Sequence, residues 1–176
     1  MAEGAKVLRF ETSVAVTSMA SPHAVYETVA DLRAHLEWSG ERASDDTFKL
    51  LALEAPGGAA RTGTAFTSTG ANFNGTFHDR SIVTEASPPS RFAIETDSRL
   101  ERKRGKVWEV RFLHRYDIMA EGTGSRIVYT DTADRMNYVP YWLQPWMRPL
   151  TRAAIHKADT KQLENLARLA EERSGR

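Results

Sequence analysis

The sequence predicts an α+β domain with a strand, two short helices, about six further strands of an antiparallel sheet, and a long C-terminal helix. Three observations predict it: an alternating segment near the N-terminus, turn signals at near-regular spacing, and an apolar stripe near the C-terminus. The 176 residues contain no internal repeat, so we expect one domain over 1–176. The sheet with its short helices would occupy 6–134, and the C-terminal helical region 137–172.

The N-terminal part predicts a strand followed by helix. Residues 7–18 (VLRFETSVAVTS) alternate and are rich in β-branched types, which is typical of a strand. Ser21 then provides a helix N-cap, and Pro22 a proline in the first helical turn. Apolar residues follow at helical spacing to about Glu37, where we expect the short helices to end.

The middle of the chain, from about 44 to 134, reads as strand and turn. Turn-forming clusters cut it into about six segments: APGG at 55–58, NFNG at 72–75, SPPS at 87–90, RKRG at 102–105 and EGTG at 121–124. This spacing favours an antiparallel meander over alternating β/α units.

The C-terminal part predicts one long helix. Over about 149–172 an apolar stripe is separated by Arg, Lys and Glu, and it consists of Leu150, Ala154, Leu163, Leu166, Ala167 and Ala170. Pro149 fits the first turn of this helix, whereas Pro140 and Pro145 would break or kink any helical turns before it.

Composition narrows the class of protein. Hydrophobic residues make up 41% and charged residues 27%, and the net charge is +1. The sequence shows no apolar leader and no apolar segment long enough to span a membrane. We therefore expect a cytoplasmic protein without a membrane span. The absence of cysteine excludes thiol chemistry. We expect no cofactor and no metal, because the histidines show neither HxH nor HExxH spacing: His23, His35, His78, His114 and His156.

A basic run, RLERKRGK at 99–106, raises the question of nucleic acid. Since the chain is otherwise balanced in charge, a solvated hairpin tip is the preferred interpretation and a nucleic-acid patch the alternative. We therefore expect no nucleic-acid partner.

Several segments together resemble the START and polyketide-cyclase (SRPBCC) superfamily, whose fold is the helix-grip fold. The matching pieces are SVAVTSMASPHAVYETVADLRAHLEWS, SIVTEASPPSRFAIET and LHRYDIMAEGTGSRIVYT, followed by the long C-terminal helix, and together they span roughly 10–172. The resemblance implies a curved antiparallel sheet of about seven strands wrapped around the C-terminal helix, with a largely apolar cavity between them. It implies no single activity, because lipid carriers, receptors, cyclases and co-chaperones share this fold.

The clearest strand, 107–119 (VWEVRFLHRYDIM), indicates which face would line that cavity. Alternate residues face opposite sides of a sheet, so the even positions face inward and the charged odd positions outward. The inward positions are Trp108, Val110, Phe112, His114, Tyr116 and Ile118. Tyr and His must find hydrogen-bond partners when buried. They serve either as satisfied core residues or as the polar part of a pocket.

The turn at EGTG predicts how the next strand pairs. If Ala120 faces Ser125, Ile127 lies opposite Ile118, Tyr129 opposite Tyr116 and Asp131 opposite His114. We therefore predict an inward pair of His114 and Asp131 close to both tyrosines, in which the carboxylate raises the His114 pKa.

Other residues join the predicted ligand-binding set by parity or position. Phe66, Phe77 and Phe92 share inward faces, and because Asp79 has the same parity as Phe77, we expect a β-bulge near it. Trp38 either lines the pocket mouth or fills the core. The full predicted set is Trp38, Phe66, Phe77, Phe92, Trp108, Phe112, His114, Tyr116, Tyr129, Asp131, Trp142, Trp146 and Leu150.

Three functions remain open at this point. The first is binding of a hydrophobic small molecule such as a lipid, a polyketide or an isoprenoid-like compound. The second is an enzyme of the polyketide cyclase/dehydrase type, with His114, Asp131 and Tyr116 as candidate catalytic residues. The third is a protein–protein interaction module similar to the superfamily's co-chaperones.

The aromatic segment 136–152 (MNYVPYWLQPWMRPLTR) lies between the last strand and the long helix. With only Arg148 and Arg152 basic, a membrane-binding helix is not favoured. We expect Trp142 and Trp146 to form a rim or lid of the cavity. A partner surface, including a homodimer contact, stays open as the alternative.

Overall fold

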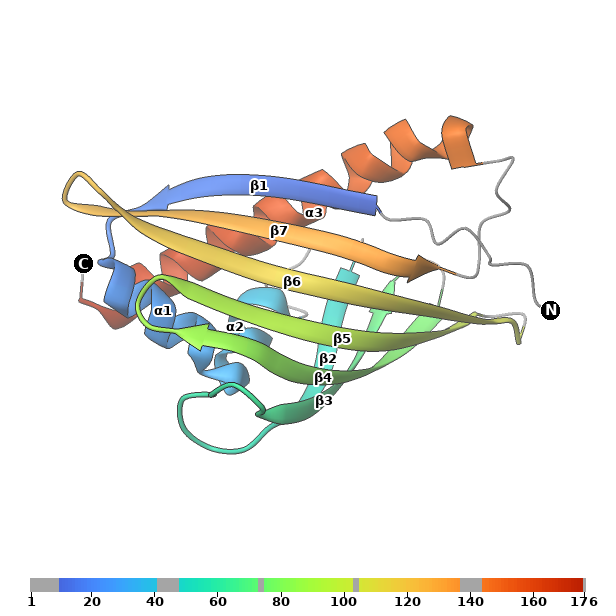
Figure 1. Ribbon diagram of the computed structural model, residues 1–176, viewed down its shortest axis with the longest axis horizontal. Helices are drawn as coiled ribbons and strands as arrows, with labels where there is room; N and C mark the ends of the chain where they lie inside the picture. The colour runs from blue at the N-terminus through green and yellow to red at the C-terminus, as the bar shows by residue number, and fades with distance from the viewer. Residues whose placement is uncertain (1–9, 41–47, 73–74, 103–104, 137–143, 176) are drawn as a thin grey trace.

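The computed structural model describes residues 10–40, 48–72, 75–102, 105–136 and 144–175, and confirms the α+β helix-grip fold (Figure 1). The elements in chain order are β1 (Phe10–Ser18), α1 (Pro22–Ala30), a 3₁₀ turn (Leu32–Ala34), α2 (His35–Ser39), β2 (Phe48–Glu54), β3 (Ala65–Asn72), β4 (Gly75–Ser87), β5 (Arg91–Arg102), β6 (Val107–Glu121), β7 (Gly124–Met136) and α3 (Gln144–Arg173).

The sheet is antiparallel throughout its described strands, in the order β1-β7-β6-β5-β4-β3-β2. Each predicted turn cluster falls between two of these strands, so the meander is confirmed. A short connection joins β6 to β7, where Glu121 pairs with Gly124 and Gly122 has a φ of 58°, a conformation that glycine adopts without steric cost.

The bulge predicted near Asp79 is absent from β4. Asp79 pairs with Ser68 and with Ser98 without a change of register, and it lies on the same face as the buried Phe77. The register of β4 against β5 shifts instead between Val83 and Glu85. The prediction was wrong because it assumed that an acidic residue must point outward, whereas a serine hydroxyl on the neighbouring strand binds this carboxylate.

The predicted start of α1 is confirmed, and the predicted start of α3 is corrected. The Ser21 side chain accepts a hydrogen bond from the Ala24 backbone N–H at 3.3 Å, as an N-cap does, and Pro22 opens α1. α3 begins at Gln144, not near Pro149, so Pro145 occupies its first turn. Proline fits there because its missing N–H would have no partner within the helix.

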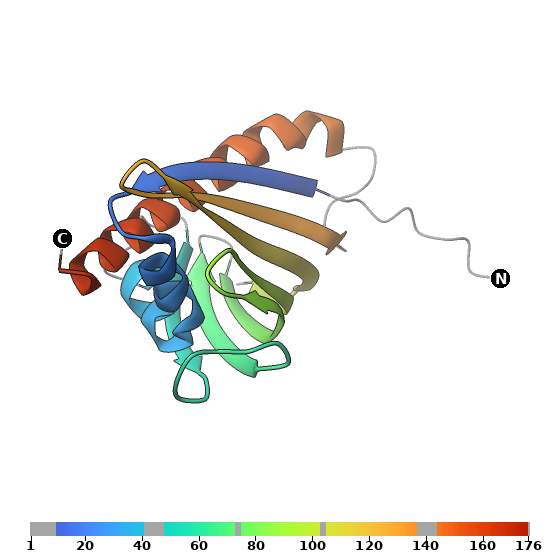
Figure 2. The same cartoon turned by 60° about the vertical axis from the view of Figure 1, so that its left-hand side comes forward.

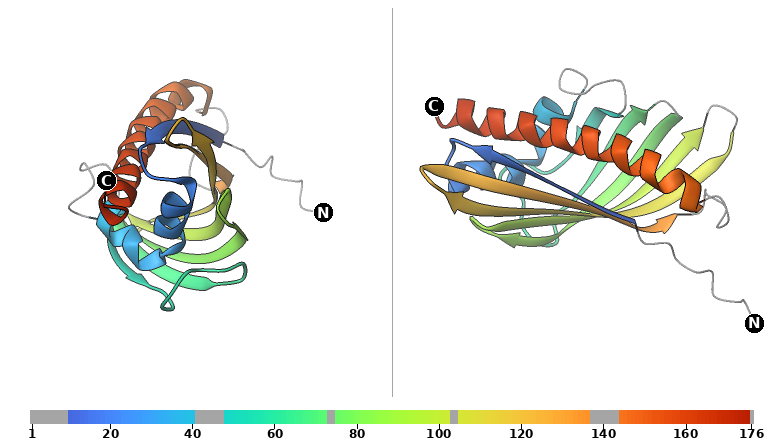
Figure 3. Two further views of the ribbon diagram at one scale, coloured as in Figure 1. Left: turned by 90° about the vertical axis from the view of Figure 1, so that its left-hand side faces the viewer. Right: turned by 90° about the horizontal axis from the view of Figure 1, so that it is seen from above.

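The sheet curves around α3, which runs lengthwise across its concave face (Figure 3). α1 and α2 cover one end, which we call the closed end, and there α1, α2 and the last part of α3 pack together (Figure 2). Arg173 also binds Asp31 and Glu37 in this region, at 3.0 and 2.8 Å. The hydrophobic core is therefore concentrated at the closed end, where its largest fully buried side chains include Phe92, Leu32, Ile127, Leu163 and Leu166.

The opposite end of the sheet, which we call the open end, holds the β5–β6 hairpin and the first turns of α3 (Figure 1). Arg152, Ala153, His156 and Lys157 are exposed there, although α3 is buried further on. The two halves of this helix thus differ in their contact with the sheet. No helix among the described residues is long and apolar enough to cross a membrane.

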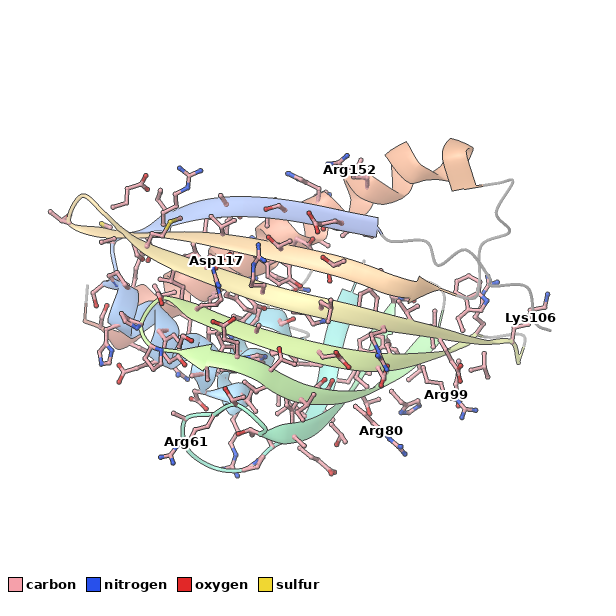
Figure 4. The ribbon with its side chains drawn as sticks, in the orientation of Figure 1. Arg61, Arg80, Arg99, Lys106, Asp117 and Arg152 are labelled. Carbon is pink, nitrogen blue, oxygen red and sulfur yellow. The ribbon has the colours of Figure 1, made fainter. Side chains whose placement is uncertain are left out.

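The convex face of the sheet carries charge. Asp117, Arg80 and Arg99 project from it, away from α3 (Figure 4). Much of this charge is paired, because Arg115 binds Asp117 at 2.9 Å and Arg111 binds Asp97 at 2.9 Å. Exposed ion pairs of this kind contribute little to stability. The candidate functional groups lie on the concave face.

Candidate functional site

The concave face of β6 becomes more accessible from the closed end toward the middle of the sheet. Ile118 is 3% exposed and Tyr116 is 6% exposed, whereas the His114 side chain is 24% exposed and Phe112 and Trp108 are half-buried. The prediction that these even-numbered residues face inward is confirmed. Since His114 lies on the inner face yet is reached by solvent, the space beside it is not filled by the described side chains.

The predicted register of β6 against β7 is confirmed at every pair. Ala120 pairs with Ser125, Ile118 with Ile127, Tyr116 with Tyr129, and His114 with Asp131. On the other side of β7, Thr12 of β1 pairs with Asp131. Thr12, Asp131 and His114 therefore form a polar row across three strands, directly beside a row that contains both tyrosines.

The His114 ring binds two of these neighbours through one nitrogen. Its Nδ1 lies 2.7 Å from the Tyr129 hydroxyl and 3.2 Å from Asp131 Oδ1. The contact with Tyr129 is the directed hydrogen bond. The contact with Asp131 is an ion pair, because Asp131 Oδ1 is buried without a hydrogen-bond partner. The ring also stacks on Phe112, with centroids 5.6 Å apart.

Electrostatics favour an imidazolium at His114 and neutral phenols beside it. Burial alone lowers the pKa of His114, but the adjacent charge of Asp131, with further contributions from Asp79 and Asp159, raises it above 6.5. Burial and nearby carboxylates raise the pKa of Tyr116 and that of Tyr129. Both tyrosines therefore offer O–H donors at any physiological pH.

Asp159 of α3 belongs to this group and was missed in the sequence. It is 9% exposed, and its Oδ2 accepts a hydrogen bond from the Thr12 hydroxyl at 3.0 Å. Burial and the charge of Asp131 raise the pKa of Asp159 to about 7, against the opposing effects of Thr12 and His114. A signal was present: Asp159 precedes Leu163 by one helical turn, so a carboxylate interrupts the apolar stripe.

Asp79 of β4 is a second inward carboxylate outside the predicted set. Ser68 donates a hydrogen bond to its Oδ2 at 3.3 Å, while its Oδ1 is buried without a partner. Burial raises the pKa of Asp79, and the charge of His114 opposes that effect. With Asp131 and Asp159 it brings three carboxyl groups into the surroundings of one imidazole.

The other predicted aromatic residues lie mainly in the core. Phe92 is fully buried against Tyr26, and Phe66 is buried in the same hydrophobic cluster. Trp38 is 3% exposed and its ring meets that of Tyr116 edge-on. Of its two predicted positions it therefore occupies the core and not the pocket mouth. Its Nε1–H is buried without a hydrogen-bond partner among the described residues. Phe77 packs over Gly70, where a Cβ would clash with its ring.

The predicted residues nearer the open end have different surroundings. The Arg102 guanidinium lies over the Trp108 ring, 4.2 Å from its centroid. Trp142 lies outside the described residues. Trp146 and Leu150 fall in the first turns of α3, where only the backbone is described. The expected aromatic rim or lid therefore remains a prediction.

A surface hollow of about 610 Å³ lies on the exposed flank of α3. Its described lining consists of His156, Lys157, Thr160, Lys161 and Glu164. None of these residues belongs to the predicted ligand-binding set. The candidate site is accordingly the polar row on the concave face, and not this hollow.

The fold and this interior together define a helix-grip domain of the SRPBCC type: a curved sheet around a C-terminal helix, with a few polar groups on an apolar concave face. The family model described as polyketide cyclase/dehydrase and lipid transport matches residues 9–171. The chain belongs to this family. Curated proteins provide no match to the sequence.

Solved structures resemble the whole domain at low sequence identity. A protein from Thermus thermophilus is 15% identical with a TM-score of 0.66, and the alignment covers 94% of this chain and 99% of that one. A Staphylococcus aureus protein of unknown function is 10% identical with a TM-score of 0.65, covering 97% and 99%. An uncharacterised Rhizobium leguminosarum protein is 14% identical with a TM-score of 0.64, covering 95% and 97%. These similarities support the fold alone.

Proposed function

We propose that this protein binds a small, largely apolar molecule between the concave face of the sheet and α3, with the polar part of the ligand at His114, Asp131 and Tyr129. The observation that carries the proposal is the accessible inner imidazole, 24% exposed, with a phenol at 2.7 Å and a carboxylate at 3.2 Å. Apolar sites with a few converging polar groups are typical of small-molecule binding.

A purely structural role explains this group less well. Burying charged groups costs several kcal/mol per ion unless each is fully paired. Here the inner oxygen of Asp131 lacks a hydrogen bond, and so does that of Asp79. A domain that needed only a core would be more stable with apolar residues at these positions, so the polar groups are better explained by a ligand.

Binding can be tested with β-naphthol, an apolar bicyclic compound with one hydroxyl group, by isothermal titration calorimetry. We expect saturable binding with a Kd below roughly 100 µM, as expected for a ligand of this size. His114→Ala should weaken it about 10-fold, because a hydrogen bond to a charged group is lost. Leu113→Ala, on the opposite face of the same strand, serves as the matched control and should leave the Kd unchanged.

Two results would contradict the proposal. One is the absence of saturable binding by any of several apolar hydroxylated compounds. The other is binding that His114→Ala and Asp131→Asn leave unchanged while both variants keep the near-ultraviolet circular dichroism of the unmodified protein.

A second candidate function is catalysis of the cyclase/dehydrase type in the same place. The observation that favours it is Asp159, a carboxyl group with a pKa of about 7 whose charge interacts with His114 and Asp131. Groups that gain and lose protons near neutral pH suit general acid–base chemistry. In a dehydration, His114 in its neutral form would take the proton next to a carbonyl that Tyr116 polarises. The resulting imidazolium would give that proton to the β-hydroxyl group as its C–O bond breaks, so that it leaves as water.

Catalysis is separated from binding by turnover. Conversion of diacetone alcohol, a simple β-hydroxy ketone, to mesityl oxide can be followed by ultraviolet absorbance. An enzyme would accelerate this loss of water, and His114→Ala would abolish the acceleration while ligand is still bound. No acceleration with this or a larger aromatic β-hydroxy ketone would leave binding as the function.

A further inference from the structure

The described interior contains more acidic than basic groups. Asp79, Asp131 and Asp159 all act electrostatically on His114, which is the single inner cation that they share. Burial lowers the pKa of His35 to about 4, so this second inner histidine is neutral. Arg102 also lies on the concave side, but its guanidinium is engaged by Trp108 near the β5–β6 hairpin.

The hydrogen-bonding capacity of this interior is also unfilled. Asp131 Oδ1 and Asp79 Oδ1 are buried acceptors that receive no hydrogen bond, although Asp131 Oδ1 forms an ion pair with His114. Tyr116 is 6% exposed, its ring lies 4.8 Å from that of Tyr129, and its hydroxyl makes no hydrogen bond with the described residues. Buried polar atoms are nearly always paired in folded proteins, so two such acceptors whose charges act on one imidazole indicate a missing donor.

The carboxyl groups of Asp131 and Asp159 come from the two layers of the fold, the sheet and α3. Thr12 pairs with Asp131 in the sheet and donates its hydroxyl hydrogen to Asp159 from α3. Thr12 thus holds the helix carboxyl close to the sheet carboxyl, and the charge of each acts on the other. A group bound between them would meet acceptors from both layers of the fold.

We propose that the ligand carries a protonated amine, held between Asp131 and Asp159 with the Tyr116 hydroxyl as a further acceptor. This inference rests on the proposed function, adds the chemical class of the ligand, and places its polar group between Asp131 and Asp159 instead of at the His114 ring. An ammonium group has three N–H donors and no acceptor, which matches unpaired carboxylate oxygens and a free phenol. The apolar body would extend along Phe112 toward the open end, where the concave face is half-buried.

A carboxylate ligand fits the same site poorly. It would gain the charge of His114, but it would also face Asp79, Asp131 and Asp159 at low dielectric. A neutral alcohol would avoid that repulsion without neutralising any of the carboxylates. The three head groups are therefore expected to bind in the order amine, alcohol, carboxylate.

The test compares decylamine, decanol and decanoate, which share one chain length, by isothermal titration calorimetry below their micelle-forming concentrations. Decylamine should bind at least about 10-fold more tightly than decanol, as a charge-assisted hydrogen bond predicts, and decanoate should bind most weakly. Asp159→Asn and Asp131→Asn should each reduce decylamine affinity about 10-fold and leave decanol within about 2-fold. Asp97→Asn, the same charge change on the convex face, should alter neither.

The pH profile of the unmodified protein provides a readout that needs no variant. Asp159 loses its proton near pH 7, so decylamine should bind more tightly at pH 8 than at pH 6, while decanol stays constant. The groups that act on Asp159 are Asp131 from β7, His114 from β6 and the uncharged Thr12 from β1.

The outcomes separate the ligand class from the proposed function. Decanoate or decanol binding as tightly as decylamine, or decylamine affinity unchanged by both aspartate variants, would overturn the amine proposal while leaving a small-molecule site in place. Failure of all three compounds and of β-naphthol to bind would instead count against the proposed function.

Discussion

His114 takes its charge state from its neighbours, at the scale of single residues. The ring is surrounded by Tyr129, Phe112 and Asp131, so its proton affinity reflects a balance between burial and an adjacent carboxylate. Asp159 is the opposite case, because burial and a like charge both disfavour its ionised form. Removal of Asp131 should lower the pKa of both residues, because its charge stabilises the imidazolium and disfavours the second carboxylate.

The pKa of His114 should lie above 6.5 and should fall when Asp131 is replaced by Asn, because burial then acts without the opposing carboxylate. Because the pKa of His114 is higher in the folded protein than in the unfolded chain, protonation of His114 stabilises the fold. This contribution is complete below pH 6.5 and is lost as pH rises through the folded-state pKa. Titration of the imidazole by NMR in both proteins measures the change. A pKa that stays the same in Asp131→Asn would contradict the ion pair.

Asp159 should make the protein less stable as pH rises. Its pKa is 3.8 in the unfolded chain and about 7 in the folded protein. The contribution of Asp159 to stability is therefore most favourable below pH 3.8, and it declines as pH rises from 3.8 through 7. Asp159→Asn, which still accepts from Thr12, should remove that decline and raise the free energy of unfolding at pH 8 by up to about 4 kcal/mol. Urea denaturation at several pH values tests this; equal pH dependence in both proteins would refute it.

At the scale of elements, local chemistry sets where most strands and helices begin and end. The Gly122 turn and the alternation of β6 together determined the register of β6 against β7, which is why His114 and Asp131 were paired correctly. The start of α3 escaped the same reasoning, because its apolar stripe begins only at Leu150. The turn before that residue contains Pro145 and Pro149 and carries no periodic signal.

The N-cap of α1 provides a test at this scale. Ser21→Ala should lower the free energy of unfolding by about 1 kcal/mol, because the Ala24 N–H loses its acceptor. Ser21→Gly is the matched control and should cost only a few tenths of a kcal/mol. Urea denaturation measures both. An equal loss in the two variants would mean that the hydroxyl does not act as a cap.

At the scale of the whole molecule, the domain is packed at one end and less filled at the other. Leu163, Leu166 and Ala170 of α3 are buried against the closed end, whereas Arg152 and His156 are exposed near the open end. One helix therefore contributes both to the core and to the boundary of the proposed site.

This asymmetry predicts different local stabilities along α3. Backbone amides at 163–170 should exchange with deuterium much more slowly than those at 152–157, because opening the former exposes core surface. A bound apolar amine should slow exchange at 152–157 more than at 163–170. Hydrogen exchange followed by mass spectrometry measures both effects, and uniform protection along α3 would contradict the division into two ends.

Local pattern was sufficient for the strands, the turns and the pairing of His114 with Asp131, because side-chain alternation, turn chemistry and a short hairpin act between near neighbours in the chain. Packing alone decided the rest. Asp159 meets Thr12 across 147 residues, and Trp38 is buried against Tyr116, because the rotation and placement of α2 and α3 on the sheet bring them there. Such contacts depend on how whole elements dock, which no short stretch of sequence encodes.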